Sequence, residues 1–184
     1  MITPTMAWVG ICVGIGALIL GPLTMYMLMA QNLRQRLQTG LKAASDLTGL
    51  TTSPTGLEGV YRSRQISVEV PTPPRSLNVD VSVSNPQAWT FQLFDVVNAS
   101  ETDAQPVLGR FCVESDPPDI AAELIRGYNL LERLERQSEL IVGLEGTQLR
   151  CALAIDQEFS GRSLVSFLDI LADLADAIER EASQ

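Results

Sequence analysis

The chain has 184 residues, of which 46% are hydrophobic and 19% charged, so it is too apolar to be intrinsically disordered and has the length of one domain. Its 13 basic and 22 acidic side chains give a formal net charge of −9, which disfavours binding to nucleic acid. The sequence contains no histidine, so it lacks the usual near-neutral general base and the commonest transition-metal ligand.

Residues 6–30 contain no charged side chain. As an α-helix this segment would be about 37 Å long, enough to cross a hydrocarbon core of about 30 Å. No basic segment precedes it and no cleavage motif follows it, which argues against a signal peptide. We therefore predict a retained transmembrane helix over residues 1–33, with Trp8 at the membrane interface and with Gly10 and Gly14 in close contact with a second helix.

A basic juxtamembrane helix and a linker with proline and glycine are predicted over residues 34–56. Arg34, Arg36 and Lys42 come before the first acidic residue, and we expect them to contact lipid headgroups at the membrane interface. The positive-inside rule then predicts a single-pass protein of the cell inner membrane, with its N-terminus outside and its C-terminal domain in the cytoplasm. The reversed topology, with the domain outside the cytoplasm, is the alternative.

A soluble acidic domain is predicted over residues 57–184. Its first half contains four segments in which apolar and polar residues alternate, as in strands with one solvent-exposed face. A helix that Gly127 is expected to divide, a β-hairpin and a long terminal helix follow. The strands are expected at residues 66–70, 77–83, 89–93 and 111–113, the hairpin at 140–155 and the terminal helix at 164–178. This order, β-β-β-β-α-β-β-α, predicts an α+β fold in which helices pack on one face of a mostly antiparallel sheet.

Three short segments accompany this layout: GVYRSR at residues 59–64, FCVESD at 111–116 ahead of a helix, and the late hairpin with its closing helix. Together they resemble an uncharacterised group of bacterial single-span, membrane-anchored α+β domain proteins. The resemblance covers about residues 59–180. It implies the architecture only and transfers no catalytic residues to this chain.

No motif in the sequence indicates a catalytic site, a cofactor or a metal site. A phosphate-binding glycine loop and a GxSxG nucleophile motif are both absent from the sequence. Glu114, Asp116 and Asp119 cluster at a strand-to-helix junction, where we interpret Asp116 and Asp119 as helix-capping residues rather than as ligands of a hard cation.

The three cysteines are too scattered for a zinc knuckle or a disulfide framework. Cys12 lies in the predicted membrane helix. Cys151 has the phase of the core residues in its strand, whereas Cys112 has the opposite phase in its own. A disulfide between Cys112 and Cys151 would be evidence for the reversed topology.

Charged side chains in two places are the remaining candidates for binding. Asp169, Asp173 and Asp176 recur at helical spacing opposite the apolar stripe of the last helix, where they form either a solvated face or a docking site for a basic partner. Arg62 and Arg64 lie one strand period apart and are expected to project from one face, toward a phosphate, a carboxylate or a salt-bridge partner.

These patterns favour a non-enzymatic accessory or scaffold subunit of a larger integral membrane complex. Its predicted partners are the lipid bilayer and integral membrane subunits of a respiratory, photosynthetic, secretory or transport complex, and not nucleic acid. The alternative is a membrane-tethered sensor or small-ligand-binding module that uses Arg62 and Arg64. A hydrolase is the weakest hypothesis, because no nucleophile–base pair is visible.

Overall fold

The computed structural model describes residues 4–72, 76–95, 107–137, 139–155 and 159–183, with side chains from Thr24 onward except at positions 26, 30 and 107. The chain forms two compact units, Met1–Gln38 and Thr39–Gln184. The second unit contains the strands and the later helices of the described residues, and it holds the candidate functional site.

The N-terminal helix α1 is continuous over Pro4–Thr48. Its described side chains begin at Thr24, and only a short methionine- and leucine-rich stretch separates that residue from Gln31 and Arg34. Within the described part of the chain, no helix combines the length and the apolar character needed to cross a bilayer. This finding contradicts the predicted transmembrane helix over residues 1–33.

The single-pass topology, the N-out orientation and the inner-membrane location all depended on that helix, and they are corrected with it. Arg34, Arg36 and Lys42 were expected to contact lipid headgroups because they followed the predicted transmembrane helix, and that reason no longer holds. Trp8 and the predicted helix-contact pair Gly10 and Gly14 lie outside the residues whose side chains the structure describes.

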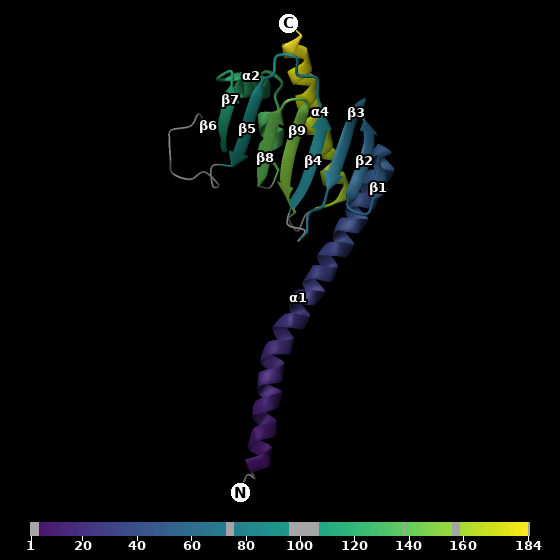
Figure 1. The fold of residues 1–184 in the computed structure, drawn as a ribbon, viewed down its shortest axis with the longest axis vertical. Coiled ribbons are helices and arrows are strands. Elements are labelled where there is room, and N and C mark those ends of the chain that lie inside the picture. Colours follow the sequence, from purple (N-terminus) through teal and green to yellow (C-terminus); the bar gives the residue numbers. More distant parts are fainter. Residues whose placement is uncertain (1–3, 73–75, 96–106, 138, 156–158, 184) are drawn as a thin grey trace. The chain divides into compact units, whose positions relative to one another are not determined.

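The second unit is built on one antiparallel sheet of nine strands in the described residues, in the order β1-β2-β3-β4-β9-β8-β5-β7-β6. The C-terminal hairpin β8–β9 lies between β4 and β5, so it joins the two halves of the sheet (Figure 1). The strands are β1 Thr51–Ser53, β2 Gly56–Tyr61, β3 Arg64–Glu69, β4 Ser76–Ser82, β5 Thr90–Asp95, β6 Val107–Leu108, β7 Phe111–Asp116, β8 Leu140–Glu145 and β9 Gln148–Ala154. The predicted α+β class and antiparallel sheet are confirmed, but the predicted order is corrected, because seven described strands rather than four precede α2.

Part of the predicted linker is folded into this sheet. Residues 51–53 form β1, which turns at residues 54–55 and pairs with β2. Gly56 is required at the start of β2, because a Cβ atom there would lie 1.7 Å from the carbonyl oxygen of Val68. The sequence pattern missed β1 because this short edge strand buries none of its side chains fully.

Helices cover one face of the sheet. They are α2 Ile120–Gly127, α3 Leu131–Glu135 and α4 Gly161–Ala182. Gly127 divides the first helical segment, as predicted, and α2 packs against β7 and α4. The predicted apolar stripe of α4 is confirmed, because Leu164, Phe167, Leu171 and Ile178 are all fully buried. Figure 1 shows α4 lying behind the central strands.

The N-terminus of α4 lies very close to the last turns of α1 within the second unit. A Cβ atom on Gly161 would lie 2.6 Å from Cβ of Ala43 and 2.8 Å from the carbonyl oxygen of Gly40. Ser160 caps α4 by accepting a hydrogen bond from the Ser163 backbone N–H at 3.2 Å. The close approach fixes where α4 begins, and the helix then runs beneath the sheet.

The opposite face of the sheet, which we call the open face, carries the alternate side chains of the same strands. On β3, β4, β8 and β9 the buried residues alternate with exposed or half-buried ones. One register row crosses the open face from β2 to β7 through Glu58, Ser67, Asp80, Arg150, Gly143, Gln92 and Glu114. The sheet is therefore apolar on its helical side and polar on the other.

Candidate functional site

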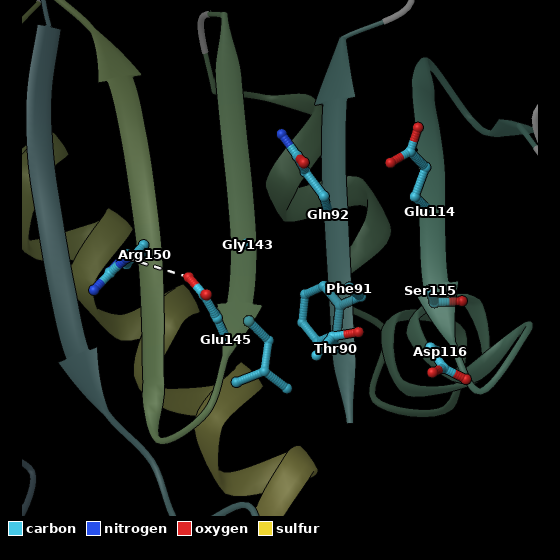
Figure 2. A pocket seen from close by; sticks show the side chains of 10 residues that line it. Thr90, Phe91, Gln92, Glu114, Ser115, Asp116, Gly143, Glu145 and Arg150 are labelled. Carbon is cyan, nitrogen blue, oxygen red and sulfur yellow. Dashed lines mark hydrogen bonds and ion pairs between the residues drawn. The ribbon is translucent and has the colours of Figure 1, made fainter. Parts of the chain in front are cut away.

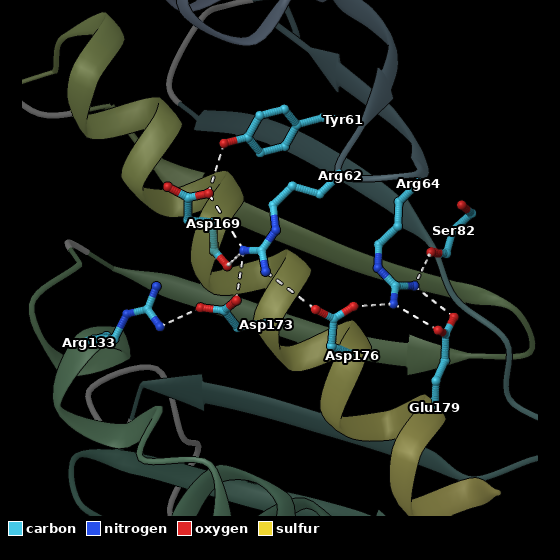
Figure 3. Close-up of polar contacts among 9 residues, drawn as sticks. All are labelled: Tyr61, Arg62, Arg64, Ser82, Arg133, Asp169, Asp173, Asp176 and Glu179. Carbon is cyan, nitrogen blue, oxygen red and sulfur yellow. Dashed lines mark hydrogen bonds and ion pairs between the residues drawn. The ribbon is translucent and has the colours of Figure 1, made fainter.

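Polar side chains gather in two places in the second unit. The first, which we call the arginine–carboxylate cluster, joins the β2–β3 hairpin to α4 and comprises Tyr61, Arg62, Arg64, Arg133, Asp169, Asp173, Asp176 and Glu179 (Figure 3). The second, which we call the sheet groove, is a shallow hollow in the open face above β5, β7, β8 and β9 (Figure 2).

The hairpin turn brings Arg62 to the cluster. Arg62 and Ser63 form the two-residue turn between β2 and β3, with φ angles of 49° and 66°. Both values lie in the left-handed region that two-residue hairpins require, where asparagine and glycine are the usual residues. Arg62 is therefore a turn residue rather than a strand residue, which corrects the expectation that it and Arg64 share one strand face.

The Arg62 guanidinium lies against three carboxylates of α4. Its nitrogens are 2.7 Å from Asp173, 3.3 Å from Asp176 and 3.7 Å from Asp169. The Tyr61 hydroxyl donates a hydrogen bond of 2.8 Å to the same Asp169 carboxylate. The three aspartates predicted as a docking site are thus brought together, and they face arginines of their own chain.

Arg64 is the most buried charged side chain of the cluster, with 8% of its surface exposed. It donates two hydrogen bonds to Glu179, at 2.7 and 2.8 Å, and one to Asp176 at 2.5 Å. Glu179 also accepts the backbone N–H of Ser84 at 2.8 Å. On the far side, Arg133 of α3 donates to Asp173 at 2.6 Å, so the cluster links α3, α4 and the hairpin.

The pairing changes the acidity of these groups. Burial opposes ionisation of Asp173, but hydrogen bonds from Arg133 and Arg62 outweigh it and hold the pKa of that carboxyl below its ordinary value. Hydrogen bonds from Arg64 likewise lower the pKa of Glu179. Burial and the bond to Asp169 raise the pKa of the Tyr61 hydroxyl. The cluster is a set of charge-assisted contacts that fastens the hairpin to α4.

The sheet groove has a volume of about 530 Å³, and its floor is backbone at Gly143. Gly143 lies in register between Arg150 of β9 and Gln92 of β5, so the strand surface is bare at that point. A Cβ atom there would meet only backbone oxygens, at 3.7 Å or more. The polar lining comes from Thr90, Gln92, Glu114, Ser115, Asp116, Glu145 and Arg150.

The predicted capping residues are positioned differently from the expectation. Asp116 is the last residue of β7, and Asp119 occupies the N-cap position of α2 but makes no side-chain capping hydrogen bond. Among the described residues, no group of acidic or cysteine side chains has an arrangement that holds a metal ion.

The two described cysteines cannot form a disulfide with each other. Cys151 is buried on the helical face of β9, as its phase predicted, and Cys112 is on the open face of β7. Strands β8 and β5 separate them. Burial raises the pKa of the Cys151 thiol well above its ordinary value, so this thiol is not an activated nucleophile.

Several residues at these two places were not singled out from the sequence. Tyr61 and Arg133 gave no signal, because their partners are far away in the chain. Gly143 did give one, since a glycine inside an alternating strand marks a bare or closely approached backbone. Glu179 follows Asp176 at helical spacing, but its pairing with Arg64, 115 residues earlier, leaves no mark in the sequence.

The comparisons with known proteins show a similarity of fold and none of sequence. No family model matches the chain, and no curated protein matches it by sequence. The crystal structure of the mycobacterial trehalose monomycolate transport factor A, TtfA, matches with a TM-score of 0.60 at 10% sequence identity. The match covers 79% of this chain and 95% of the TtfA chain. The α+β architecture is therefore shared with TtfA.

Proposed function

We propose that the chain is a non-enzymatic accessory factor of a transport assembly, which acts by binding other protein subunits. The observation that carries the proposal is the match to TtfA over 95% of that chain, because TtfA is itself a transport factor. Of the respiratory, photosynthetic, secretory and transport complexes that the sequence left open, the match favours transport. The proposed partners are integral membrane subunits of that assembly.

The chemistry of the described side chains supports an accessory role rather than catalysis. The arginines and acids of the cluster are engaged with one another, and Cys151 is buried with a raised pKa. The chain has no histidine to activate a nucleophile. The excess of acidic side chains also favours a protein partner over nucleic acid.

The pocket at Arg62 and Arg64 does not favour the ligand-binding alternative. The hollow is lined by both arginines together with Asp176 and Glu179. The two carboxylates already accept hydrogen bonds from Arg64 and Arg62, so an anionic ligand would have to displace them. Binding such a ligand would therefore require the free energy of separating several charge-assisted hydrogen bonds.

Affinity purification from the native cells tests the proposal. The full chain is tagged, expressed at its normal level, cross-linked briefly and purified in mild detergent, and the co-purifying proteins are identified by mass spectrometry. We expect subunits of one transporter, and we expect deletion of the chain to lower transport of that transporter's substrate. Recovery of the chain alone, or undiminished transport in the deletion strain, would refute the proposal.

A further inference from the structure

The charges of the second unit are divided unequally between the two sides of the sheet. On the helical side, Arg62, Arg64 and Arg133 lie against the carboxylates of α4. On the open face, the described strands carry a single arginine, Arg150, whose ion pairs reach Asp80 at 3.6 Å and Glu145 at 3.3 Å. The acids that project from this face are Glu58, Glu69, Asp80, Glu114, Asp116 and Glu145. The open face therefore has a large excess of negative charge.

The strand register distributes these acids across the sheet. Glu58 and Asp80 lie in one row with Arg150 and Glu114, while Glu69 belongs to the neighbouring row. Fixed carboxylates on one surface make the local electrostatic potential more negative and attract a cationic partner over a Debye length of about 8 Å at physiological salt. The excess is thus complementary to a basic surface and repels nucleic acid.

The acidic open face also contains a hollow, the sheet groove, that could receive a side chain of the partner. Gly143 leaves the backbone bare between Arg150 and Gln92, and Figure 2 shows the polar side chains standing around that gap. Ile141, two residues earlier on β8, is 39% exposed on the same face. A lysine or arginine side chain has an apolar stem and a charged end, which matches an apolar spot beside acidic residues.

We propose that the open face docks a lysine- and arginine-rich segment of a partner protein, with one long basic side chain lying over Gly143 in the sheet groove. The stem of that side chain packs near Ile141, and its charged end lies among Glu114, Asp116 and Glu145. This inference rests on the proposed function, because it names the surface by which the accessory factor holds its partner.

A binding measurement with the full chain tests the docking surface. The probe is a synthetic twelve-residue peptide of alternating lysine, arginine and leucine, and the reference peptide has glutamine at every basic position. The acid-neutralising variant Glu114→Gln/Asp116→Asn/Glu145→Gln is expected to bind the basic peptide about tenfold more weakly, the sum of several exposed ion pairs. The reference peptide is expected not to bind.

A matched control separates docking from general attraction. The variant Asp46→Asn/Glu123→Gln/Glu132→Gln changes the net charge by the same amount at exposed helical positions outside the groove lining. We expect its affinity to stay within about twofold of the unchanged chain. Equal losses in the two triple variants would overturn the proposal, since they would show attraction by net charge alone.

Two single substitutions test the groove itself. Gly143→Leu fills the floor without changing the charge, and Gln92→Lys places a positive charge at its centre; both are expected to weaken peptide binding, with unchanged folding checked by circular dichroism. The second variant keeps the test valid if the first fails to fold. Binding that both folded variants leave intact would overturn the proposed position of the basic side chain.

The same variants distinguish this inference from the proposed function. If the acid-neutralising variant retains the transporter subunits in the purification, the docking surface is wrong and the accessory role stands. If the chain binds the basic peptide through the open face but no transporter subunit is recovered, the surface stands and the role is wrong. If the chain self-associates and the acid-neutralising variant abolishes that self-association, the proposal that the open face binds a separate protein is wrong.

Discussion

Arg64 anchors the arginine–carboxylate cluster because it is buried and bonded to two carboxylates at once. Its guanidinium donates to Glu179 and Asp176, and it also donates to the carbonyl oxygen of Ser82 at 3.3 Å. Removing one partner of a buried charged set leaves the others desolvated and unpaired. Arg64 therefore matters to the hairpin chiefly because its removal would leave partly buried carboxylates without their hydrogen-bond donor.

Replacing Arg64 by alanine is expected to lower the free energy of unfolding by about 2 to 4 kcal/mol, because Glu179 would lose its cation and Asp176 would keep only Arg62, at 3.3 Å. Urea unfolding of the two proteins measures the difference. Arg136→Ala is the control, since the Arg136–Glu132 pair is exposed, and its loss should be under about 0.5 kcal/mol. Equal losses would show that the cluster is only a surface network.

The lowered pKa values of Asp173 and Glu179 predict that the domain loses stability in acid. Their ordinary values are 3.8 and 4.5, and both are lower in the folded chain. The unfolded chain therefore binds more protons at acidic pH, so the stabilisation is present above about pH 4.5 and is lost as the pH falls through the folded-state values. Asp173→Asn/Glu179→Gln should be less stable at pH 7 and should lose less on acidification, as measured by urea unfolding from pH 7 to pH 3. Parallel pH curves would contradict this.

At the scale of elements, the alternation of apolar residues predicted the strands that have one buried face. Strands β3, β4, β8 and β9 fall where that pattern placed them. Three strands were missed: the short edge strands β1 and β6, which carry little of the pattern, and β2, which has glycine at two of its six positions. The sheet order was also beyond the sequence, because β4 pairs with β9 about 70 residues later through backbone hydrogen bonds that any residue can make.

In the candidate site, too, the local sequence pattern predicted some features and long-range contacts decided the others. The grouping of Asp169, Asp173 and Asp176 follows from helical periodicity and was predicted. Their partners were not, because the contact of Arg62 with α4 depends on a hairpin turn with two left-handed residues and no glycine. Side-chain charge alone does not distinguish a docking face from a face that is already paired.

The contact between α4 and the end of α1 predicts a glycine requirement at the start of α4. Gly161→Ala is expected to destabilise the domain by about 2 kcal/mol, because the added methyl group would overlap Ala43 and the Gly40 carbonyl. Gly127→Ala adds the same methyl group where nothing lies within 4 Å, and its stability should stay equal or rise slightly. Thermal unfolding compares the two variants. A harmless Gly161→Ala would show that the two helices can separate.

At the scale of the whole molecule, the folded domain begins before the acidic sequence does. Ala44 at the end of α1 and Leu50 ahead of β1 are buried, at 0% and 2% exposure, and Gly40 lies close to Phe159. These residues precede position 57, where composition and charge placed the start of the domain. Apolar burial, rather than a change of composition, sets the boundary of a cooperative unit.

Two fragments test where that unit begins. Residues 39–184 contain the whole second compact unit, so we expect them to fold with one cooperative urea transition. Residues 57–184 lack β1, Ala44 and Leu50; losing the burial of Leu50 alone removes about 2 kcal/mol, and strand β2 would become an open edge. The shorter fragment should therefore unfold at a lower urea concentration and aggregate more readily, which light scattering would detect. Equal stability of the two fragments would instead place the boundary at residue 57 and make the end of α1 dispensable.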